Sequence, residues 1–383
     1  MKRPFALIGI TYLSVQAALF YLESDLAAAI LTAVCFIGTI VSLFILKNRN
    51  LRHTVLGFCL TAAFASTIFS GYNIFVKQPI VDKYSEREIY VTATVLEQPT
   101  VQYDTYRYLI ETDSINGKIE KLKICLSTIN ELNVEEFDRI SCVLPLKECT
   151  KSQMIADGAF LQASVNKNFA YIVKKTDDKP LYYQAVKIRE NFADSFEQNM
   201  SQDCASLCRA VLLGEKTALS QEIQNDFTRC GVSFLIVVSG MHLAIISSFV
   251  FLCIKKIIKN RVLRSMIMLM CAFSFMAVTG FAPSVVRAGV MLAVVYSGKM
   301  FMRKGDSLNS LGIAALILTV PNPTAVADVG MLLSFTATLG IILWARKILV
   351  YIMGKFAKLK RLKKPVEFTV NLFAVSVSAT VWT

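Results

Sequence analysis

The sequence predicts a polytopic α-helical membrane protein that carries one sizeable soluble domain. The chain has 383 residues, of which 54% are hydrophobic and 18% are charged. Soluble domains normally contain about 25% charged residues. The apolar excess lies in nearly charge-free blocks of about 20 residues, each long enough to cross a ~30 Å hydrocarbon core as a helix. The basic residues also gather at one end of successive blocks, as topology signals do.

Nine blocks are predicted to span the membrane. The first follows Lys2 and Arg3, and the second begins after only three residues, so we interpret the first as a retained helix and not a cleaved signal. The seventh block is short and could be tilted or re-entrant. The ninth reaches the end of the sequence, and we expect the chain to be a fragment of a longer protein. The predicted spans are 5–22, 26–46, 55–76, 232–254, 266–281, 284–302, 308–320, 326–345 and 366–383.

The distribution of Lys and Arg predicts how these spans are oriented. Basic residues precede span one and follow spans two, four, six and eight. The loops at 281–284 and 321–327 contain none, and the short connection after span one has only Glu23 and Asp25 as charged residues. Because basic loops stay in the cytoplasm, the N-terminus is predicted inside and residues 77–231 outside, with the cytoplasmic membrane as location.

The net charge of +13 is therefore a topology signal. Residues 77–231 contain 19 Lys and Arg against 23 Asp and Glu, which gives −4. The remainder contains 22 against 5 and accounts for the positive excess. The charge does not indicate a general nucleic-acid surface on the soluble domain, so any phosphate-binding surface there has to be local.

Residues 77–180 are predicted to form a small β-barrel or sandwich. Apolar residues alternate with others along 89–96, which is the period of a half-buried strand. Asn116 and Gly117 separate two further strands, 106–115 and 118–126, and favour a type I′ hairpin turn. Additional strands are predicted at 139–146 and 160–173.

Residues 181–231 are predicted to form amphipathic helices. Ile188, Phe192 and Phe196 recur every four residues and form one apolar stripe. Such helices pack on a domain or lie at the membrane surface. A second short helix is predicted at 204–213, and Ser220 is suited to cap a third that Gly231 ends. The predicted domains are thus 1–76, 77–180, 181–231 and a membrane core at 232–383.

Three of the ten cysteines lie in the predicted strand region, where an extracytoplasmic location permits disulfides. Three thiols cannot all pair with one another, so we expect one bond and one spare. Cys125 is predicted to pair with either Cys142 or Cys149. Cys204 and Cys208 lie four apart on a predicted helix, but two ligands without a nearby second pair do not indicate a metal site.

Polar residues in the predicted membrane half are costly in lipid and are candidates for a function. Ser239 and His242 lie three apart in the stretch 231–243 (GVSFLIVVSGMHL), and Gly240 could break the helix or allow close packing. Pro283 is predicted to end one helix and start another, with Arg287 in the first turn. Packing, snorkelling and helix capping are the structural alternatives. The candidate channel-lining residues are Ser239, Gly240, His242, Pro283, Ser284, Arg287, Asn309 and Asp328.

The sequence lacks the residue patterns of soluble enzymes. It contains no phosphate-binding Walker loop, no HExxH, no GxSxG and no cluster of metal ligands. With two histidines, a histidine-based hydrolytic site is not expected. We therefore expect neither catalysis nor a cofactor within these residues, and no power source for transport.

Five motifs in a fixed order resemble those of the ComEC-type competence channels. The segments are 210–220 (AVLLGEKTALS), 231–243, 283–288 (PSVVRA), 306–309 (DSLN) and 321–335, which contains PNP and VGMLLSF. The resemblance implies uptake of single-stranded DNA across the cytoplasmic membrane during natural transformation. It also implies an OB-like domain between the N-terminal spans and the channel core, with a disulfide that involves Cys125. Many members carry a C-terminal metallo-β-lactamase-like domain, whose sequence is missing here.

The resemblance suggests how DNA would contact the chain. OB-type surfaces hold single strands by aromatic stacking and basic contacts. Tyr103, Tyr106, Arg107 and Tyr108 form a candidate cluster, with ordinary strand packing as the alternative. The expected partners are single-stranded DNA, membrane lipid, a surface DNA receptor and a cytoplasmic helicase or ATPase, and an oligomer is possible.

Two other functions stay open at this stage. A membrane-bound nuclease would need the missing C-terminal domain. A small-molecule transporter or an envelope assembly factor could share the scaffold, because transporters also use broken helices around polar residues.

Overall fold

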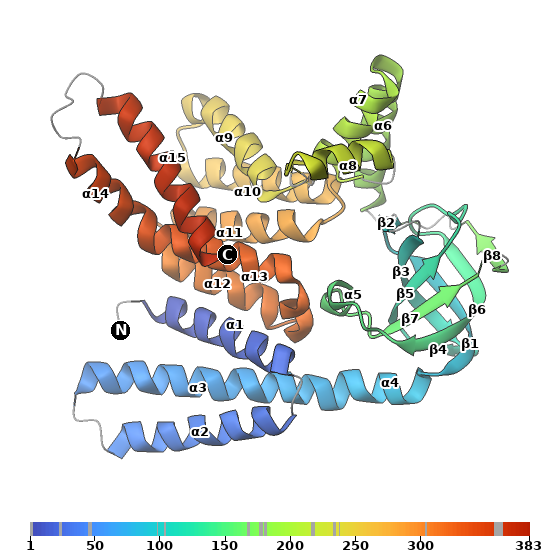
Figure 1. Ribbon diagram of the computed structural model, residues 1–383, viewed down its shortest axis with the longest axis horizontal. Helices are drawn as coiled ribbons and strands as arrows, with labels where there is room; N and C mark the ends of the chain where they lie inside the picture. The colour runs from blue at the N-terminus through green and yellow to red at the C-terminus, as the bar shows by residue number, and fades with distance from the viewer. Residues whose placement is uncertain are drawn as a thin grey trace. The chain divides into compact units, whose positions relative to one another are not determined.

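A computed structural model describes most of the chain (Figure 1). Contacts between residues divide the chain into two compact units. One unit contains residues 1–70 and 297–383, and the other contains residues 71–296. The predicted membrane core at 232–383 is thus divided between the two. The described residues are 3–22, 25–44, 48–97, 99–102, 105–166, 169–175, 179, 182–215, 219–232, 235–236, 238–302, 305–355 and 363–383.

The first unit is helical. Its helices α1 and α12 cross at two glycines, because a Cβ on Gly9 would lie 2.1 Å from the carbonyl oxygen of Gly312. Small residues let helix backbones approach closely inside a membrane, where hydrophobic burial between helices gives little driving force. The helices assigned to this unit are α1 (Pro4–Leu22), α2 (Asp25–Phe44), α3 (Arg49–Tyr72, whose last two residues fall in the other unit), α12 (Ser307–Thr319), α13 (Val329–Gly340), α14 (Arg346–Lys355) and α15 (Lys363–Trp382).

Five helical runs among the described residues are long and apolar enough to cross a membrane, as expected of a multi-pass membrane protein. Three shorter apolar helices coincide with the second, seventh and ninth predicted spans. The five runs are Pro4–Leu22, Leu51–Tyr84, Gly240–Ile257, Arg261–Val278 and Val329–Gly354, and the shorter helices are Ala29–Ile40, Ser307–Thr319 and Val366–Trp382.

The helix that contains the third predicted span continues beyond the apolar residues that predicted it. Helix α3 continues through a π-helical turn, η1 (Asn73–Lys77), into α4 (Gln78–Tyr84), so that 34 residues form one run. At 1.5 Å per residue this run is about 50 Å long, well beyond a ~30 Å hydrocarbon core. The sequence predicted an end near residue 76 because hydropathy reports lipid contact and not helix continuity.

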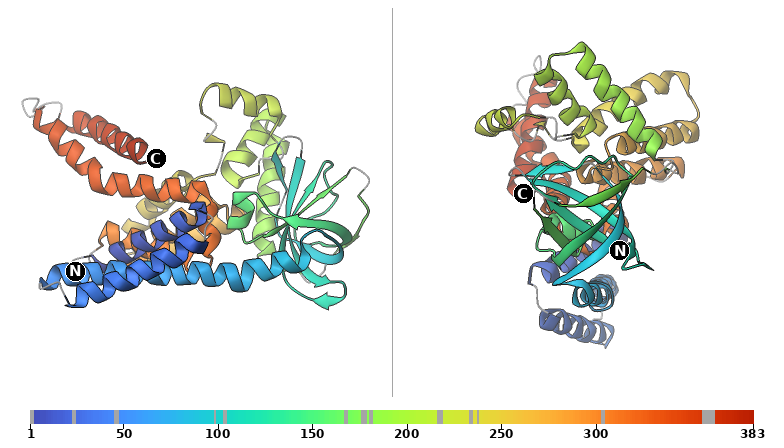
Figure 2. Two further views of the ribbon diagram at one scale, coloured as in Figure 1. Left: turned by 60° about the horizontal axis from the view of Figure 1, so that its bottom comes forward. Right: turned by 90° about the vertical axis from the view of Figure 1, so that its right-hand side faces the viewer.

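The second unit begins with a closed five-stranded barrel (Figure 2). The ladder runs β1-β3-β5-β7-β6 and returns to β1, with β5 and β7 parallel and the other pairs antiparallel. Inward-facing residues of all five strands form one apolar core. The barrel strands are β1 (Arg87–Val95), β3 (Thr105–Ile115), β5 (Lys123–Thr128), β6 (Arg139–Glu148) and β7 (Leu161–Val165), and the added strands are β2 (Thr100–Gln102), β4 (Lys118–Ile119) and β8 (Tyr171–Lys174).

The predicted hairpin turn is confirmed. Asn116 and Gly117 have φ angles of +47° and +79°, as a type I′ turn requires. Two predicted strands are each divided in the structure. The run 118–126 forms β4 and β5, and the run 160–173 forms β7 and β8, because β8 leaves the barrel path and pairs only with β6.

Four helical segments follow the barrel: α6 (Tyr183–Asn199), α7 (Gln202–Cys208), the π-helical turn η2 (Arg209–Leu213) and α8 (Gln221–Arg229). The predicted cap of α8 is confirmed, since the Ile223 N–H donates to Ser220 Oγ at 3.3 Å. The packing face of α6 differs from the prediction. Ile188 and Phe192 are 46% and 51% exposed, whereas Arg189 is buried on the packed face with Val186 and Ala193.

Three helices complete the second unit: α9 (Gly240–Ile257), α10 (Arg261–Val278) and α11 (Pro283–Met300). The fourth predicted span, 232–254, is wrong at its start. Its described residues before Gly240 are not α-helical, although all of them except Ser239 are apolar. Pro283 begins α11 as predicted. Helix α9 therefore starts at an interruption in an apolar stretch.

Candidate functional site

The start of α9 brings Ser239 and His242 together. His242 Nδ1 accepts a hydrogen bond from the Ser239 backbone N–H at 3.1 Å and lies 3.2 Å from Ser239 Oγ. The predicted pair therefore exists, but as a helix cap and not as neighbours on one helix face. Because Nδ1 accepts from a backbone amide, a neutral His242 carries its proton on Nε2. That second nitrogen is the one able to meet another group.

The start of α11 is tied to the same interruption. Ser284 Oγ donates to the Val238 carbonyl at 2.7 Å, which satisfies a backbone acceptor outside the helices. A Cβ on Gly240 would lie 2.8 Å from the Cβ of Ala288, so glycine permits close approach of α9 and α11. Serine side chains commonly satisfy freed backbone groups where membrane helices are interrupted. We call residues 238–242 and 283–288 the helix break.

Arg287 belongs to the helix break. It follows Ser284 by three positions on α11, so both lie on the same side of this helix. A cation so near a helix N-terminus opposes the positive end of the helix dipole. The helix dipole therefore does not explain its position, and its contact with an anion stays a prediction.

The 210–220 motif packs beside the helix break. Gly214 has φ +87°, a left-handed conformation that favours glycine. A Cβ there would lie 3.5 Å from the Thr279 carbonyl oxygen and 3.7 Å from Val238 Cγ2. Three motifs that are separate in the sequence thus meet in one region of this unit.

Asn309 and Asp328 lie in the other compact unit and act locally there. Asn309 Oδ1 accepts from the Ala6 N–H at 3.1 Å and so links α12 to α1. Asp328 Oδ1 accepts from the Gly330 N–H at 2.9 Å and caps α13, as the capping alternative predicted. Neither is brought to the helix break by the contacts within its unit.

The predicted aromatic cluster on β3 does not form one surface. Tyr103 lies outside the described residues. Tyr108 is 1% exposed, and its hydroxyl accepts a hydrogen bond from the Leu132 N–H at 2.8 Å. Tyr106 packs against the same core, whereas Arg107 faces the opposite side because strand residues alternate. Tyr108 is therefore a core residue in this conformation and has no surface on which a base could stack.

Arg107 instead belongs to a basic face that the sequence did not indicate. Arg107 is paired with Ser127 across the β3–β5 ladder. Lys151 Nζ lies 3.5 Å from Ser127 Oγ, and Lys123 Nζ donates to the Asp157 carbonyl at 3.1 Å. These cations come from three separate parts of the sequence, so no local run of charges announces them. Arg107, Lys123 and Lys151 are partly exposed, whereas Ser127 is buried among them. We call these four residues the basic face.

The three barrel cysteines are buried free thiols in this structure. Cys142 points into the barrel core with Ile140 and Leu144, whereas Cys125 lies between the core residues Ile124 and Leu126 and so faces outward. The pKa of the Cys149 thiol is raised by burial and also by the charge of the Cys125 thiolate, which marks these two as neighbours. Cys125 and Cys142 thus face opposite sides of the barrel wall, and the pairing of Cys125 with Cys149 stays a prediction.

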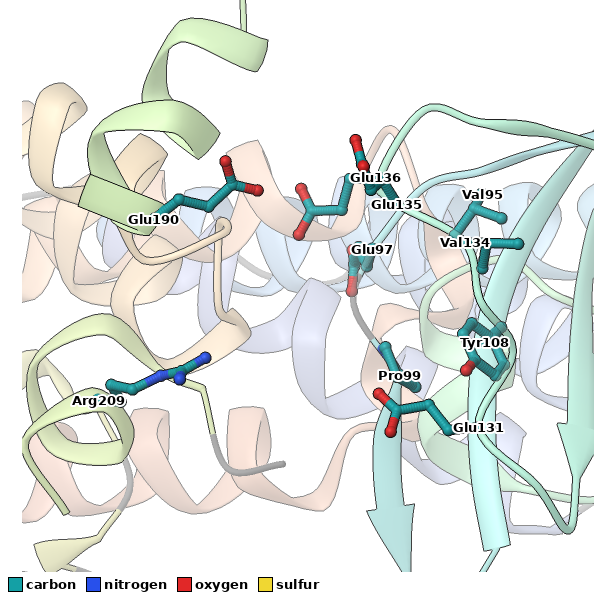
Figure 3. Close-up of a pocket in the computed structure, with 10 residues that line it drawn as sticks. All are labelled: Val95, Glu97, Pro99, Tyr108, Glu131, Val134, Glu135, Glu136, Glu190 and Arg209. Carbon is teal, nitrogen blue, oxygen red and sulfur yellow. The ribbon is translucent and has the colours of Figure 1, made fainter. Parts of the chain in front are cut away.

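An acidic cavity of about 210 Å³ lies where the barrel meets the helices after it (Figure 3). Glu190 and Arg209 line one side, and barrel residues line the other. Burial, together with the charges of Asp157 and Glu136, raises the pKa of Glu97 to about 7, although the residue as a whole is exposed. A cavity lined by five glutamates disfavours phosphate groups. The five are Glu97, Glu131, Glu135, Glu136 and Glu190.

These features define a class of protein, namely a multi-pass helical chain with a small barrel and an interrupted apolar helix. Residues 211–383 match the sequence model of the Competence protein family. The chain is also 24% identical over 161 residues to the ComE operon protein 3 of Bacillus subtilis (strain 168). The helix break lies inside the matched residues.

The similarity to the Bacillus protein is distant and partial. The aligned residues make up 42% of this chain and 21% of the relative's length. No solved structure matches the chain. Among the described residues, no group of three or more His, Cys, Asp or Glu side chains is placed to hold a metal ion.

Proposed function

We propose that this chain is the membrane channel subunit that passes single-stranded DNA across the cytoplasmic membrane during natural transformation. The observation that carries the proposal is the helix break, which lies within the residues that match the Competence protein family. It joins the non-helical residue Val238 to the start of α11, the helix that carries Arg287. The match to this family supports a role in DNA uptake. The proposal makes that role specific to the channel.

The physics of lipid supports this assignment of the helix break. Non-helical backbone at membrane depth is tolerated only where protein buries it or where it lines a water-filled cavity. In the proposed topology the N-terminus is inside, nine spans cross the membrane and residues 77–231 lie outside. The strand would pass His242, Ser284 and Arg287, where donors and a positive charge suit a phosphate backbone.

The barrel supports a role in handling the strand before it enters. Its ladder, with one parallel pair and closure of β1 on β6, has the strand order of an OB-like barrel. OB-type domains hold single strands along positively charged grooves. The basic face is the surface that we assign to DNA, in place of the predicted aromatic cluster.

The remaining machinery would come from other proteins. Directional transport against a gradient needs an energy source, and the sequence contains no nucleotide-binding motif. We therefore propose a cytoplasmic helicase or ATPase and a surface DNA receptor as partners. We also propose that these residues break no covalent bond, so that any strand degradation requires a further domain or protein.

One observation favours a second function. Interrupted helices around polar residues are also typical of small-molecule transporters, in which the break binds the substrate. A transporter would not need the basic face on the barrel. Substitution of that face therefore separates the two functions.

A transformation assay with two pools of labelled DNA tests the proposal. The gene is deleted in the source organism under competent conditions and restored as wild type, as His242→Ala or as Arg287→Ala, with membrane levels checked by immunoblot. We expect deletion to leave surface-bound DNA in place and to abolish internalised DNA, and each substitution to lower internalisation. Unchanged uptake in the deletion strain would overturn the channel assignment and favour a transporter.

A further inference from the structure

A buried arginine contacts three separate segments in the region between the barrel and the turn that connects α10 to α11. We call this region the joint. Arg189 lies on α6 and is only 4% exposed. Its Nη2 pairs with Glu136 of the barrel loop before β6, and its Nε lies 3.1 Å from Glu215 Oε1 in the 210–220 motif. Its Nη1 faces the turn between α10 and α11, since a Cβ on Gly280 would lie 3.0 Å from it.

The charges in this joint form a closed group. Glu136 and Glu215 have side chains only 5% and 3% exposed, so little water reaches them. Glu215 Oε2 also lies 2.9 Å from Arg209 Nη2, which fixes the position of this carboxylate from the other side. Burial alone would lower the pKa of Arg189, but the charges of Glu136 and Glu215 more than offset burial and raise it. The arginine is therefore held as a cation.

A second series of contacts, between aromatic rings, connects the same two regions as the contacts of Arg189. Phe137 stacks edge-on against Tyr182 at 5.8 Å between ring centroids, and Tyr182 packs against Phe281 at 5.3 Å. Phe281 in turn meets Phe273 of α10 at 5.9 Å. The two series of contacts thus start at consecutive barrel residues, 136 and 137, and end at consecutive turn residues, 280 and 281.

The backbone is strained at both ends of this aromatic series. Phe137 and Phe281 have φ angles of +69° and +51°, which bulky residues rarely adopt. Such strain persists only where the surroundings over-determine the backbone. Tyr182 is the N-cap residue of α6 and lies seven positions before Arg189, which is about two helical turns, so one helix and its cap hold both contacts.

We propose that Arg189 and Tyr182 make α6 a strut that fixes the barrel loop 131–137 to the α10–α11 turn and so positions the start of α11. This inference rests on the proposed function, because the start of α11 carries Ser284 and Arg287 of the helix break. Through the strut, a strand that displaces the barrel loop also displaces the helix break. Arg189 and Tyr182 are positioning residues that need not touch DNA.

The strut can be tested without DNA by amide hydrogen exchange on the purified full chain in detergent micelles. The variants are Arg189→Lys, which keeps one charge but loses the planar fork, and Tyr182→Leu, which removes the stacked ring. The matched control is Arg229→Lys on α8, whose side chain is 82% exposed. Tyr182→Phe keeps the ring and serves as the conservative rescue.

We expect Arg189→Lys and Tyr182→Leu each to raise exchange on the order of tenfold in both 131–137 and 279–282, since either change releases both ends of a shared contact. The control and Tyr182→Phe should leave the 279–282 turn as in wild type. Faster exchange confined to one of the two ends, or the same rise in the control, would overturn the strut.

The uptake assay then tests the positioning role separately. Arg189→Lys should lower internalised DNA about tenfold with surface-bound DNA unchanged, because the helix break moves while the basic face stays intact. Normal uptake despite loosened exchange would overturn the positioning role. If the wild-type protein moves no DNA, the proposed function fails, and the exchange comparison still decides whether the strut exists.

Discussion

The strut joint and the helix break bury polar groups in opposite ways. The joint buries full charges and pairs each with a partner, as Arg189 is paired with Glu136 and Glu215. The hydrogen bonds that close the helix break join neutral groups, as between Ser284 and the Val238 carbonyl, and its cation Arg287 lies further along α11. Losing one partner of a buried charge pair is far more costly than losing a neutral hydrogen bond. The joint is therefore built to stay closed, and the break can open at lower cost.

The largest expected effect is on the joint. Arg189→Met keeps much of the side-chain volume but leaves the buried Glu136 without its cation and removes one of the two arginines beside Glu215. We expect a loss of about 3–5 kcal/mol in the free energy of unfolding, measured by chemical unfolding in detergent. A loss below 1 kcal/mol, comparable to the exposed control Arg229→Met, would mean that the joint is not held by its charges.

The next effect concerns the thiols of the barrel. If Cys125 and Cys149 oxidise to a disulfide, the closed loop of about 25 residues should stabilise the barrel by about 3 kcal/mol. After mild oxidation we expect mass-tag labelling under denaturing conditions to find Cys142 free and the other two protected. Cys149→Ser should restore labelling of Cys125. Protection of Cys142 together with Cys125 would contradict the geometry of the barrel wall.

A smaller effect is expected in the helix break. Ser284→Ala removes the donor to the Val238 carbonyl and should destabilise the protein by about 1–2 kcal/mol. Ser284→Thr keeps the hydroxyl and is the matched control. Thermal unfolding in detergent provides the measurement. If alanine and threonine behave alike, the hydrogen bond contributes nothing, and the contrast between the two regions loses one of its two sides.

The smallest expected effect depends on pH and on Glu97 in the acidic cavity. Its pKa is raised from its ordinary value near 4.5 to about 7, so the folded state holds this proton more tightly than the unfolded state. Its contribution to stability is therefore fully present below pH 4.5 and is lost as pH rises through 7. We expect Glu97→Gln to flatten the fall in melting temperature between pH 5 and pH 8. An unchanged slope would assign that fall to other groups.

The sequence predicted well what local chemistry decides. Asn116 and Gly117 form the expected turn because both tolerate positive φ, and Ser220 caps α8 because its hydroxyl lies next to free amides. The cap role of Asp328 was found for the same reason. Each of these features depends on a few neighbouring residues.

The sequence could not predict what distant contacts decide. The stripe of Ile188 and Phe192 indicated an amphipathic α6, but the helix packs through Arg189, whose partners lie 53 and 26 positions away. Hydropathy likewise could not reveal where α9 begins, because Val232, Leu235, Ile236 and Val238 are apolar, and Gly240 was the sequence's indication of a break. The basic face was missed because its cations come from different strands and loops.

The most direct test of the central claim is photo-crosslinking of a transported strand at the helix break. A photoreactive amino acid replaces His242 in one strain and Met270 in another, where Met270 is 70% exposed on α10. Illumination takes place during uptake of labelled DNA into competent cells. The account predicts that DNA crosslinks at position 242 and not at position 270. DNA uptake that continues, even at a lowered level, without a crosslink at position 242 would contradict passage through the break, and so would equal crosslinking at both positions.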